Sequence, residues 1–327
     1  MSHPAAGRAS AWRRRWPAIR RALLAVFLLL VAALIVLQAR EIEWDRVLRA
    51  IRAYDRATLL RAAALGAGGY LAYACFDLLA RPYGRCDPPA RRIMTVTFVS
   101  YAFNLNLGSF VGGAGFRYRL YAKLGVDGAT ITRILALSLV TNWLGYAWLA
   151  GGLFAAGALR LPQDWELGTG ALRGIGVALL AAAAGYVALC ACARRRAWTV
   201  RGYAVELPAL RVALAQSGLA VASWACMGGV AWVLLPEGPG YAQVLAVLLL
   251  GSVASAFTHV PAGVGVIEAI FLALLGSQES RFEILGALLA YRAIYYLIPL
   301  ALATAVYAGL EAGWRRGRRV QACAGPP

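Results

Sequence analysis

The chain has 327 residues, of which 61% are hydrophobic and only 15% carry a charge. This composition excludes a soluble globular domain and predicts an all-α polytopic membrane protein. A formal net charge of +18 would suggest nucleic-acid binding in a soluble protein. Here the cations lie between apolar runs, where they orient the chain and contact anionic lipid headgroups. We therefore expect membrane lipids as partners and no nucleic acid.

The residues that carry most enzyme and metal chemistry are sparse. The chain has six scattered cysteines and two histidines, His3 and His259. No CxxC pair and no cysteine–histidine ligand spacing occurs, so we expect no disulfide framework, no metal site and no cofactor. One intramembrane histidine with one glutamate, and no nucleophile motif, is too little to define a reaction. We expect no enzyme activity.

Nine apolar runs follow a basic N-terminus, residues 1–21. The first run follows an arginine cluster, as in a signal peptide, but it is long and lacks a cleavage site, which favours an uncleaved span. Between the first two runs, Ile42–Tyr54 has one apolar helical face and is expected to lie in the membrane interface. The apolar runs are Ala22–Leu37, Thr58–Ala80, Ile93–Val111, Thr130–Ala158, Ala171–Ala193, Val212–Leu235, Tyr241–Phe257, Val264–Gly276 and Ile284–Leu310.

The distribution of charge shows that not every run crosses. The N-terminus and the tail, residues 311–327, are both basic and should both be cytoplasmic, whereas nine crossings would separate them. If Ile93–Val111 crossed, every later loop would violate the positive-inside rule. All later loops agree with the rule if the chain turns back at Asn104–Gly115. We therefore predict a re-entrant element that enters from the cytoplasm.

The same parity argument applies to the second half of the chain. The last span must run from the outside of the membrane to the cytoplasm. Tyr241–Gly276 must therefore begin and end outside, as a hairpin broken at His259–Gly263. Whether its arms cross the whole bilayer is left open. The expected single membrane domain, residues 22–310, thus has about six full crossings and two broken elements from opposite faces. Residues 58–158 and 212–310 would form inverted halves, a recurring transporter architecture.

The first break combines polar, glycine and cationic residues at membrane depth. Irregular backbone survives there only where protein or a wet cavity covers it. Next to a cationic cluster, such backbone suggests an anion-binding cavity; the alternative is a cytoplasmic loop that happens to be basic. The candidate headgroup-binding residues in this break are Asn104, Asn106, Gly112, Gly113, Arg117 and Arg119.

The second break offers the N-terminus of a restarted helix, whose unpaired N–H groups suit a phosphate. Gly263 and Gly265 interrupt the helix here. His259 is either a ligand contact or a structural hydrogen-bond donor. Glu268 and Arg292 are expected to pair with each other rather than contact substrate directly. Tyr295, in the last span, is either a contact residue or part of an interfacial aromatic belt.

Four segments of the chain together resemble the lysylphosphatidylglycerol synthase transmembrane-region family, also called flippase-like. The resemblance implies a membrane part that translocates aminoacylated phosphatidylglycerol in the bacterial inner membrane. It also implies a separate soluble domain that transfers the aminoacyl group, which we expect to be absent because the sequence ends at Pro327. The segments are SYAFNLNLGSFVGGAGFRYRLYAKLG, ITRILALSLVTNWLGY, HVPAGVGVIEA and LLAYRAIYYLIPL, at residues 100–125, 131–146, 259–269 and 288–300.

The resemblance places function at the Gly112–Arg119 loop, His259–Gly265, Glu268 and Arg292–Tyr296. We expect a lipid translocator that binds an anionic phospholipid or related headgroup between the two broken helices. Three alternatives remain. A scaffold or regulator of lipid metabolism would have tightly packed breaks. A membrane transferase would use His259 with Glu268. A carrier of a small soluble anion would have a cavity closed to lipid.

Overall fold

The computed structural model divides the chain into two compact units, Met1–Trp44 and Asp45–Pro327, and the description below concerns the second. The expected first span, Ala22–Leu37, most of Ile42–Tyr54 and His259 lie outside the described residues. The expected division at residues 22 and 310 stays a prediction. Described are residues 45, 49, 52–83, 88–159, 161–162, 165, 168–193, 197–200, 203–236, 238–258, 263–276 and 281–323, without the side chains of 82–83, 197–200, 203–205 and 315–323.

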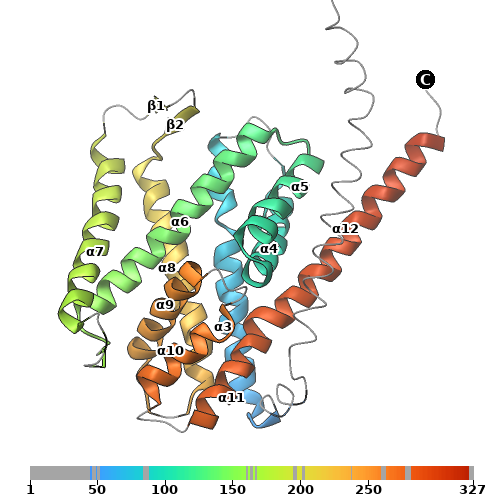
Figure 1. The fold of residues 1–327 in the computed structure, drawn as a ribbon. Coiled ribbons are helices and arrows are strands. Elements are labelled where there is room, and N and C mark those ends of the chain that lie inside the picture. Colours follow the sequence, from blue (N-terminus) through green and yellow to red (C-terminus); the bar gives the residue numbers. More distant parts are fainter. Residues whose placement is uncertain are drawn as a thin grey trace, which may run out of the picture. The chain divides into compact units, whose positions relative to one another are not determined.

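Six helical segments of the described chain are long and apolar enough to cross a membrane, which confirms an all-α polytopic protein (Figure 1). Five of them run through the unit in alternating directions in Figure 1. The sixth, α9, belongs to a hairpin. The segments are Arg56–Arg81 (α3 and the start of η1), Gly128–Ala155 (α6), Thr169–Cys192 (α7), Leu210–Leu234 (α8), Tyr241–Thr258 (α9) and Arg281–Trp314 (α11, η4 and part of α12).

Aspartates fix where two of the spans begin. Asp55 caps α3 (Arg56–Ala74) and Asp127 caps α6, each accepting a hydrogen bond from the backbone N–H three residues on. The Thr130 hydroxyl also donates to Asp127 Oδ2 at 2.6 Å. These bonds favour the ionised carboxyl and lower the pKa of Asp127. Local cap chemistry thus sets the start of each helix.

One short sheet was not expected. Between α7 and α8, strands β1 (Ala197–Val200) and β2 (Tyr203–Glu206) pair antiparallel, with Val200 opposite Tyr203. Aromatic and β-branched residues at Trp198, Thr199 and Val205 favour strands over helix, so the connection closes as a hairpin.

The first break turns the chain back on itself, as predicted. Helix α4 (Ala90–Leu107) ends at Gly108, whose φ of +80° suits glycine, and the π-helix η2 (Ser109–Gly115) leads into α5 (Phe116–Lys123). A Cβ on Gly112 would lie 2.2 Å from the carbonyl carbon of Phe103. The returning limb therefore packs directly against α4. The irregular backbone begins at Gly108, inside the predicted range Asn104–Gly115.

The second break also forms a hairpin. Helix α9 ends at Thr258 and α10 runs from Val266 to Leu275, with Gly263 and Gly265 at φ +59° and +81° just before it. The two helices pack side by side. In Figure 1 the first hairpin opens toward the end of the unit that carries β1 and β2, and the second opens toward the opposite end, next to α11. This arrangement agrees with entry from opposite faces.

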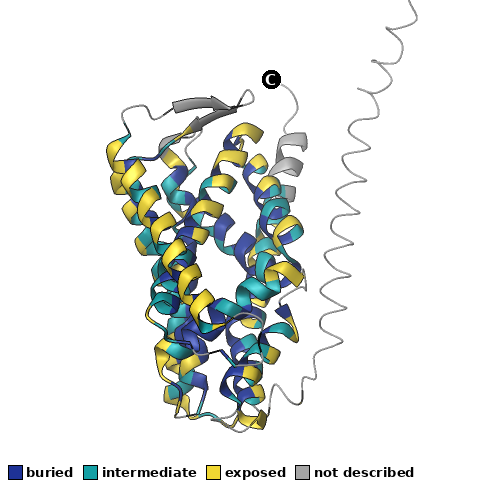
Figure 2. Cartoon of the chain, turned by 60° about the vertical axis from the view of Figure 1, so that its left-hand side comes forward, coloured by how far each residue is buried: buried dark blue, intermediate teal, exposed yellow. Residues whose placement is uncertain are grey.

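Small residues let the crossing helices approach closely, as is common where helices pack in lipid. Between α3 and α8, a Cβ on Gly69 would lie 3.2 Å from the Cβ of Cys226, and the Ser223 hydroxyl donates to Gly69 O at 3.1 Å. Gly145 of α6 meets Ala220 of α8 in the same way. Figure 2 shows the buried positions gathered between these helices and the exposed positions on the outer faces.

Candidate functional site

The last crossing segment contains a π-helix that the first hairpin contacts, and the second hairpin contacts Arg292 directly before it. Helix α11 (Arg281–Arg292) continues into η4 (Ala293–Leu297) and then α12 (Ile298–Cys323). A π-helix leaves backbone groups outside the regular α ladder and occurs often at functional sites. The Tyr70 hydroxyl donates to Tyr295 O at 3.1 Å. Asn106 Nδ2 donates to Tyr296 O at 3.3 Å and to Ala102 O at 2.8 Å. Asn106 thereby joins the first hairpin to η4.

Tyr295 lies at the centre of a buried cluster of tyrosines. Its side chain is fully buried, its hydroxyl is 3.4 Å from that of Tyr101, and its ring packs against those of Tyr70, Tyr291 and Tyr296. An interfacial belt would leave such rings exposed at headgroup depth. The belt interpretation is therefore wrong for Tyr295, which packs the protein interior beside η4.

Glu268 and Arg292 form the expected pair. Arg292 Nε lies 2.5 Å from Glu268 Oε1, and Arg292 Nη2 donates to Glu268 Oε2 at 3.0 Å and to Gly263 O at 3.1 Å. The Gly265 N–H donates to Glu268 Oε2 at 2.9 Å, which caps the start of α10. Both side chains keep some exposure, 14% for Arg292 and 18% for Glu268. The pair therefore anchors the second hairpin to α11 and still reaches the surface of the unit.

Arg117 forms a buried ion pair with Asp77, 40 residues earlier in the sequence. Its guanidinium donates to Asp77 Oδ2 at 3.0 Å, to Asp77 Oδ1 at 3.3 Å and to the Ser138 hydroxyl at 3.1 Å. The Tyr121 hydroxyl donates to the same carboxylate at 2.9 Å. Arg117 and Asp77 are 3% and 1% exposed. This network ties α5 to η1 (Asp77–Tyr83) and to α6, so the charge of Arg117 is neutralised inside the protein.

Arg119 and Lys123 of α5 both face Glu311 of α12. Arg119 Nη2 lies 3.2 Å from Glu311 Oε1, and Lys123 forms an ion pair with the other carboxylate oxygen. Arg119 is 7% exposed and stacks over the Tyr307 ring at 5.6 Å. Apart from the ion pair with Glu311, the Arg119 guanidinium makes no hydrogen bond within the described residues. The cluster is a contact between the first hairpin and the last helix.

The remaining candidates of the first break shape its turn. A Cβ on Gly113 would lie 2.8 Å from Asn104 Oδ1, so glycine at this position lets the returning limb lie against the asparagine. At the tip, Phe110 is 90% exposed. No position is assigned to His259, which lies outside the described residues.

Taken together, the predicted residues fall into two groups. One group surrounds η4 and connects both hairpins: Asn106 from the first, and Gly263, Gly265 and Glu268 from the second, through Arg292 and Tyr295–Tyr296. The other group, Arg117 and Arg119, binds carboxylates on η1 and α12. The sequence did not identify Tyr70, Tyr121 and Glu311. Tyr121 binds Asp77, 44 residues away, and Glu311 binds Lys123, 188 residues away. Contacts over such sequence separations leave no local pattern that a reading of the sequence could detect.

No metal site emerges from the part of the chain that the structure describes. Within those residues, no group of three or more histidine, cysteine, aspartate and glutamate side chains is placed to hold a metal ion. The charged groups that lie at membrane depth instead bind one another, as intramembrane charges usually do.

The six apolar helices and the two opposed hairpins define a polytopic helical membrane protein with discontinuous elements. The chain belongs to the family described as "Lysylphosphatidylglycerol synthase TM region", whose sequence model matches residues 22–303. It is 46% identical over 298 residues to "Inner membrane protein YbhN" of Escherichia coli K12, covering 91% of this chain and 94% of that one. It is 30% identical over 284 residues to "Uncharacterized protein slr0712" of Synechocystis, covering 85% and 87%.

Proposed function

We propose that the protein moves a phospholipid between the leaflets of the bacterial inner membrane. The observation that supports this most is the pair of helical hairpins, which open toward opposite ends of the unit and are both bonded to the last crossing segment, the first at Tyr296 of η4 and the second at Arg292 of α11. Discontinuous helices of this kind, in halves of inverted orientation, form substrate sites near the bilayer midplane in many transporters. The name of the E. coli relative, an inner membrane protein, supports the location.

The headgroup would bind at the turn of the second hairpin. Arg292 is part-buried and keeps 14% exposure, so it can offer a guanidinium to a phosphate. A Cβ on Gly265 would meet no atom within 4 Å, which leaves open space beside the start of α10. The adjacent Glu268 would face a cationic part of a headgroup. Asn104, at the first break, would border the same path. Arg117 supports the fold instead, because it and its partner Asp77 are both buried, whereas the Arg292–Glu268 pair keeps some exposure.

The positive-inside rule supports cytoplasmic termini. Arg91, Arg92, Lys123, Arg133 and Arg211 lie toward the end of the unit where α4, α6 and α8 begin, and Arg56, Arg61, Arg173 and Arg281 lie toward the other end, where α3, α7 and α11 begin. The first of these ends would face the cytoplasm. Helix α12 runs toward it in Figure 1. With the first apolar run counted as a span, the N-terminus also lies inside, as the sequence predicts.

A transferase is less well supported by the second hairpin. Glu268 accepts hydrogen bonds from Arg292 and from the Gly265 N–H. Because both carboxylate oxygens already accept hydrogen bonds from these donors, Glu268 is poorly placed to take a proton from a substrate. The chain is therefore proposed to act without catalysing a covalent reaction. A scaffold that binds lipid without moving it remains the main alternative, and the exchange experiment separates the two.

The test is lipid exchange by the purified full chain in vesicles that carry phosphatidylglycerol with a fluorescent headgroup. A membrane-impermeant reductant bleaches the outer leaflet, and exchange then exposes the inner leaflet. We expect faster bleaching than in protein-free vesicles. Arg292→Gln should slow exchange by roughly tenfold, since a charged hydrogen bond contributes about 1.5–3 kcal/mol. Arg281→Gln, at the exposed start of α11, is the control. Wild-type exchange at the protein-free rate contradicts the proposal.

A further inference from the structure

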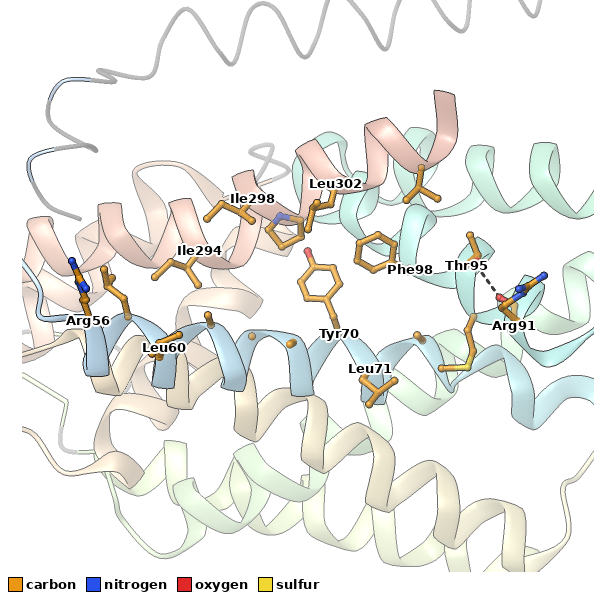
Figure 3. A pocket seen from close by; sticks show the side chains of 18 residues that line it. Arg56, Leu60, Tyr70, Leu71, Arg91, Thr95, Phe98, Ile294, Ile298 and Leu302 are labelled. Atoms are coloured by element: carbon orange, nitrogen blue, oxygen red, sulfur yellow. Dashed lines mark hydrogen bonds between the residues drawn. The ribbon is translucent and has the colours of Figure 1, made fainter. Parts of the chain in front are cut away.

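A long apolar groove lies between α3, α4 and the last span, away from the hairpin turns (Figure 3). Its volume is about 1090 Å³, at the upper end of the range for small-molecule sites. Apolar side chains form almost all of its wall. Several of them are strongly exposed in the described unit: Leu60 at 70%, Leu71 at 58%, Leu302 at 56% and Ile298 at 52%.

The groove follows the whole length of α3. Arg56 and Ala74, the first and last residues of this 19-residue helix, both line it. At 1.5 Å per residue the helix is about 28 Å long, close to the roughly 30 Å thickness of the hydrocarbon core of a bilayer. The groove therefore extends through both leaflets. A molecule that occupies this groove must be apolar over nearly the full thickness of the membrane.

The few polar groups of the groove lie at its ends or already have partners. The Tyr70 hydroxyl, near the middle, donates to Tyr295 O, and the Thr95 hydroxyl donates to Arg91 O. Arg56 lies at one end and Arg91 at the other, as Figure 3 shows, and both are exposed. Guanidinium groups suit phosphates because they donate in a fixed fork. Arg91 also lies in the first turn of α4, whose positive dipole end carries no acidic residue.

We propose that this groove is a phospholipid-binding site that holds one lipid from each leaflet. The acyl chains would lie along α3 and meet near Tyr70, with one phosphate at Arg91 and the other at Arg56. The site binds lipid tails, unlike the headgroup path proposed at the second hairpin. It requires only that the unit lies in a membrane. Lipid in the groove without any exchange would therefore contradict translocation and leave this site intact.

The test uses the full chain in vesicles of phosphatidylethanolamine and phosphatidylglycerol, with phosphatidylglycerol that carries a photoreactive acyl chain as the probe. Mass spectrometry then maps the labelled residues. We expect label on α3 and on Leu302 and Val306 of α12, above the level on the exposed faces of α7. Ala67→Trp, which fills the groove, should remove this label, whereas Ala64→Trp, exposed on α3 but outside the groove, should keep it.

The arginines are tested in the same way. Arg91→Ala should reduce label on the adjoining part of the groove by roughly fivefold, because one arginine near anionic lipid contributes about 1 kcal/mol. Arg92→Ala is the matched control, since Arg92 is exposed but does not line the groove. Equal label in Ala67→Trp and Ala64→Trp would overturn the proposal. So would a cross-link from position 67 to residues 22–37, which would show that the chain's own first apolar run occupies the groove.

Discussion

For Arg117, the role predicted from the sequence differs from the contacts found in the structure. Its place in a glycine-rich break indicated a ligand contact, and its spacing gave no sign of Asp77, which lies 40 residues earlier. Both charges are buried in one network with Tyr121 and Ser138. Removing one partner of a buried pair leaves an uncompensated charge, whereas removing both leaves none. The structural and the ligand-binding roles therefore predict different outcomes for mutation.

Arg117→Met should destabilise the protein by about 3–5 kcal/mol, because Asp77 is then buried without its cation. The double variant Arg117→Met with Asp77→Leu should recover most of that loss, since no unpaired charge remains. Thermal unfolding of the purified chain in detergent, followed by size-exclusion, measures both. Equal unfolding temperatures for the single and the double variant would show that the pair does not hold α5 in place.

At the scale of elements, charge parity predicted both hairpins, with the first turn within Asn104–Gly115. The irregular backbone occupies Gly108–Gly115, the later part of that range. In the structure, Asn106 stays helical because its side chain bonds Ala102 O, four residues back, and Tyr296 O on the last span. That second partner is 190 residues away. Neither it nor the π-helix at η4 has a local sequence pattern, so neither could be predicted.

Gly112 is the residue on which the first hairpin most depends. A Cβ there would lie 2.2 Å from Phe103 C and 2.4 Å from Asn104 N, both backbone atoms of a packed helix. Gly112→Ala should therefore separate η2 from α4 and cost at least about 1–3 kcal/mol, the usual range for overpacking. Gly286→Ala, at a helical position with no atom within 4 Å, should be neutral or slightly stabilising. The unfolding temperature of each variant measures the effect. Equal unfolding temperatures for Gly112→Ala and Gly286→Ala would contradict the close packing of the turn.

At the scale of the whole molecule, the five crossing segments other than α9 in the described residues followed from composition and charge, because the bilayer restricts spans to apolar helices. The first predicted span, Ala22–Leu37, lies outside those residues. The position of the substrate could not be predicted in this way. Candidate cations in the first hairpin proved to be paired with Asp77 and Glu311, while the partly exposed pair Glu268–Arg292 lies at the second. Both hairpins are bonded to the last span, the first at Tyr296 of η4 and the second at Arg292, the last residue of α11. Movement of one half should therefore be transmitted to the other through this segment.

If lipid passes between the hairpins, their tips must change separation during the cycle. Spin labels at Phe110 and Phe257, which are 90% and 80% exposed at the two tips, report this distance. The background is the full chain with its six cysteines replaced by alanine. Electron–electron double resonance in phosphatidylethanolamine vesicles should show two distance populations, whose ratio shifts when phosphatidylglycerol is added. A single narrow distance that is the same with and without phosphatidylglycerol would contradict alternating movement of the two halves.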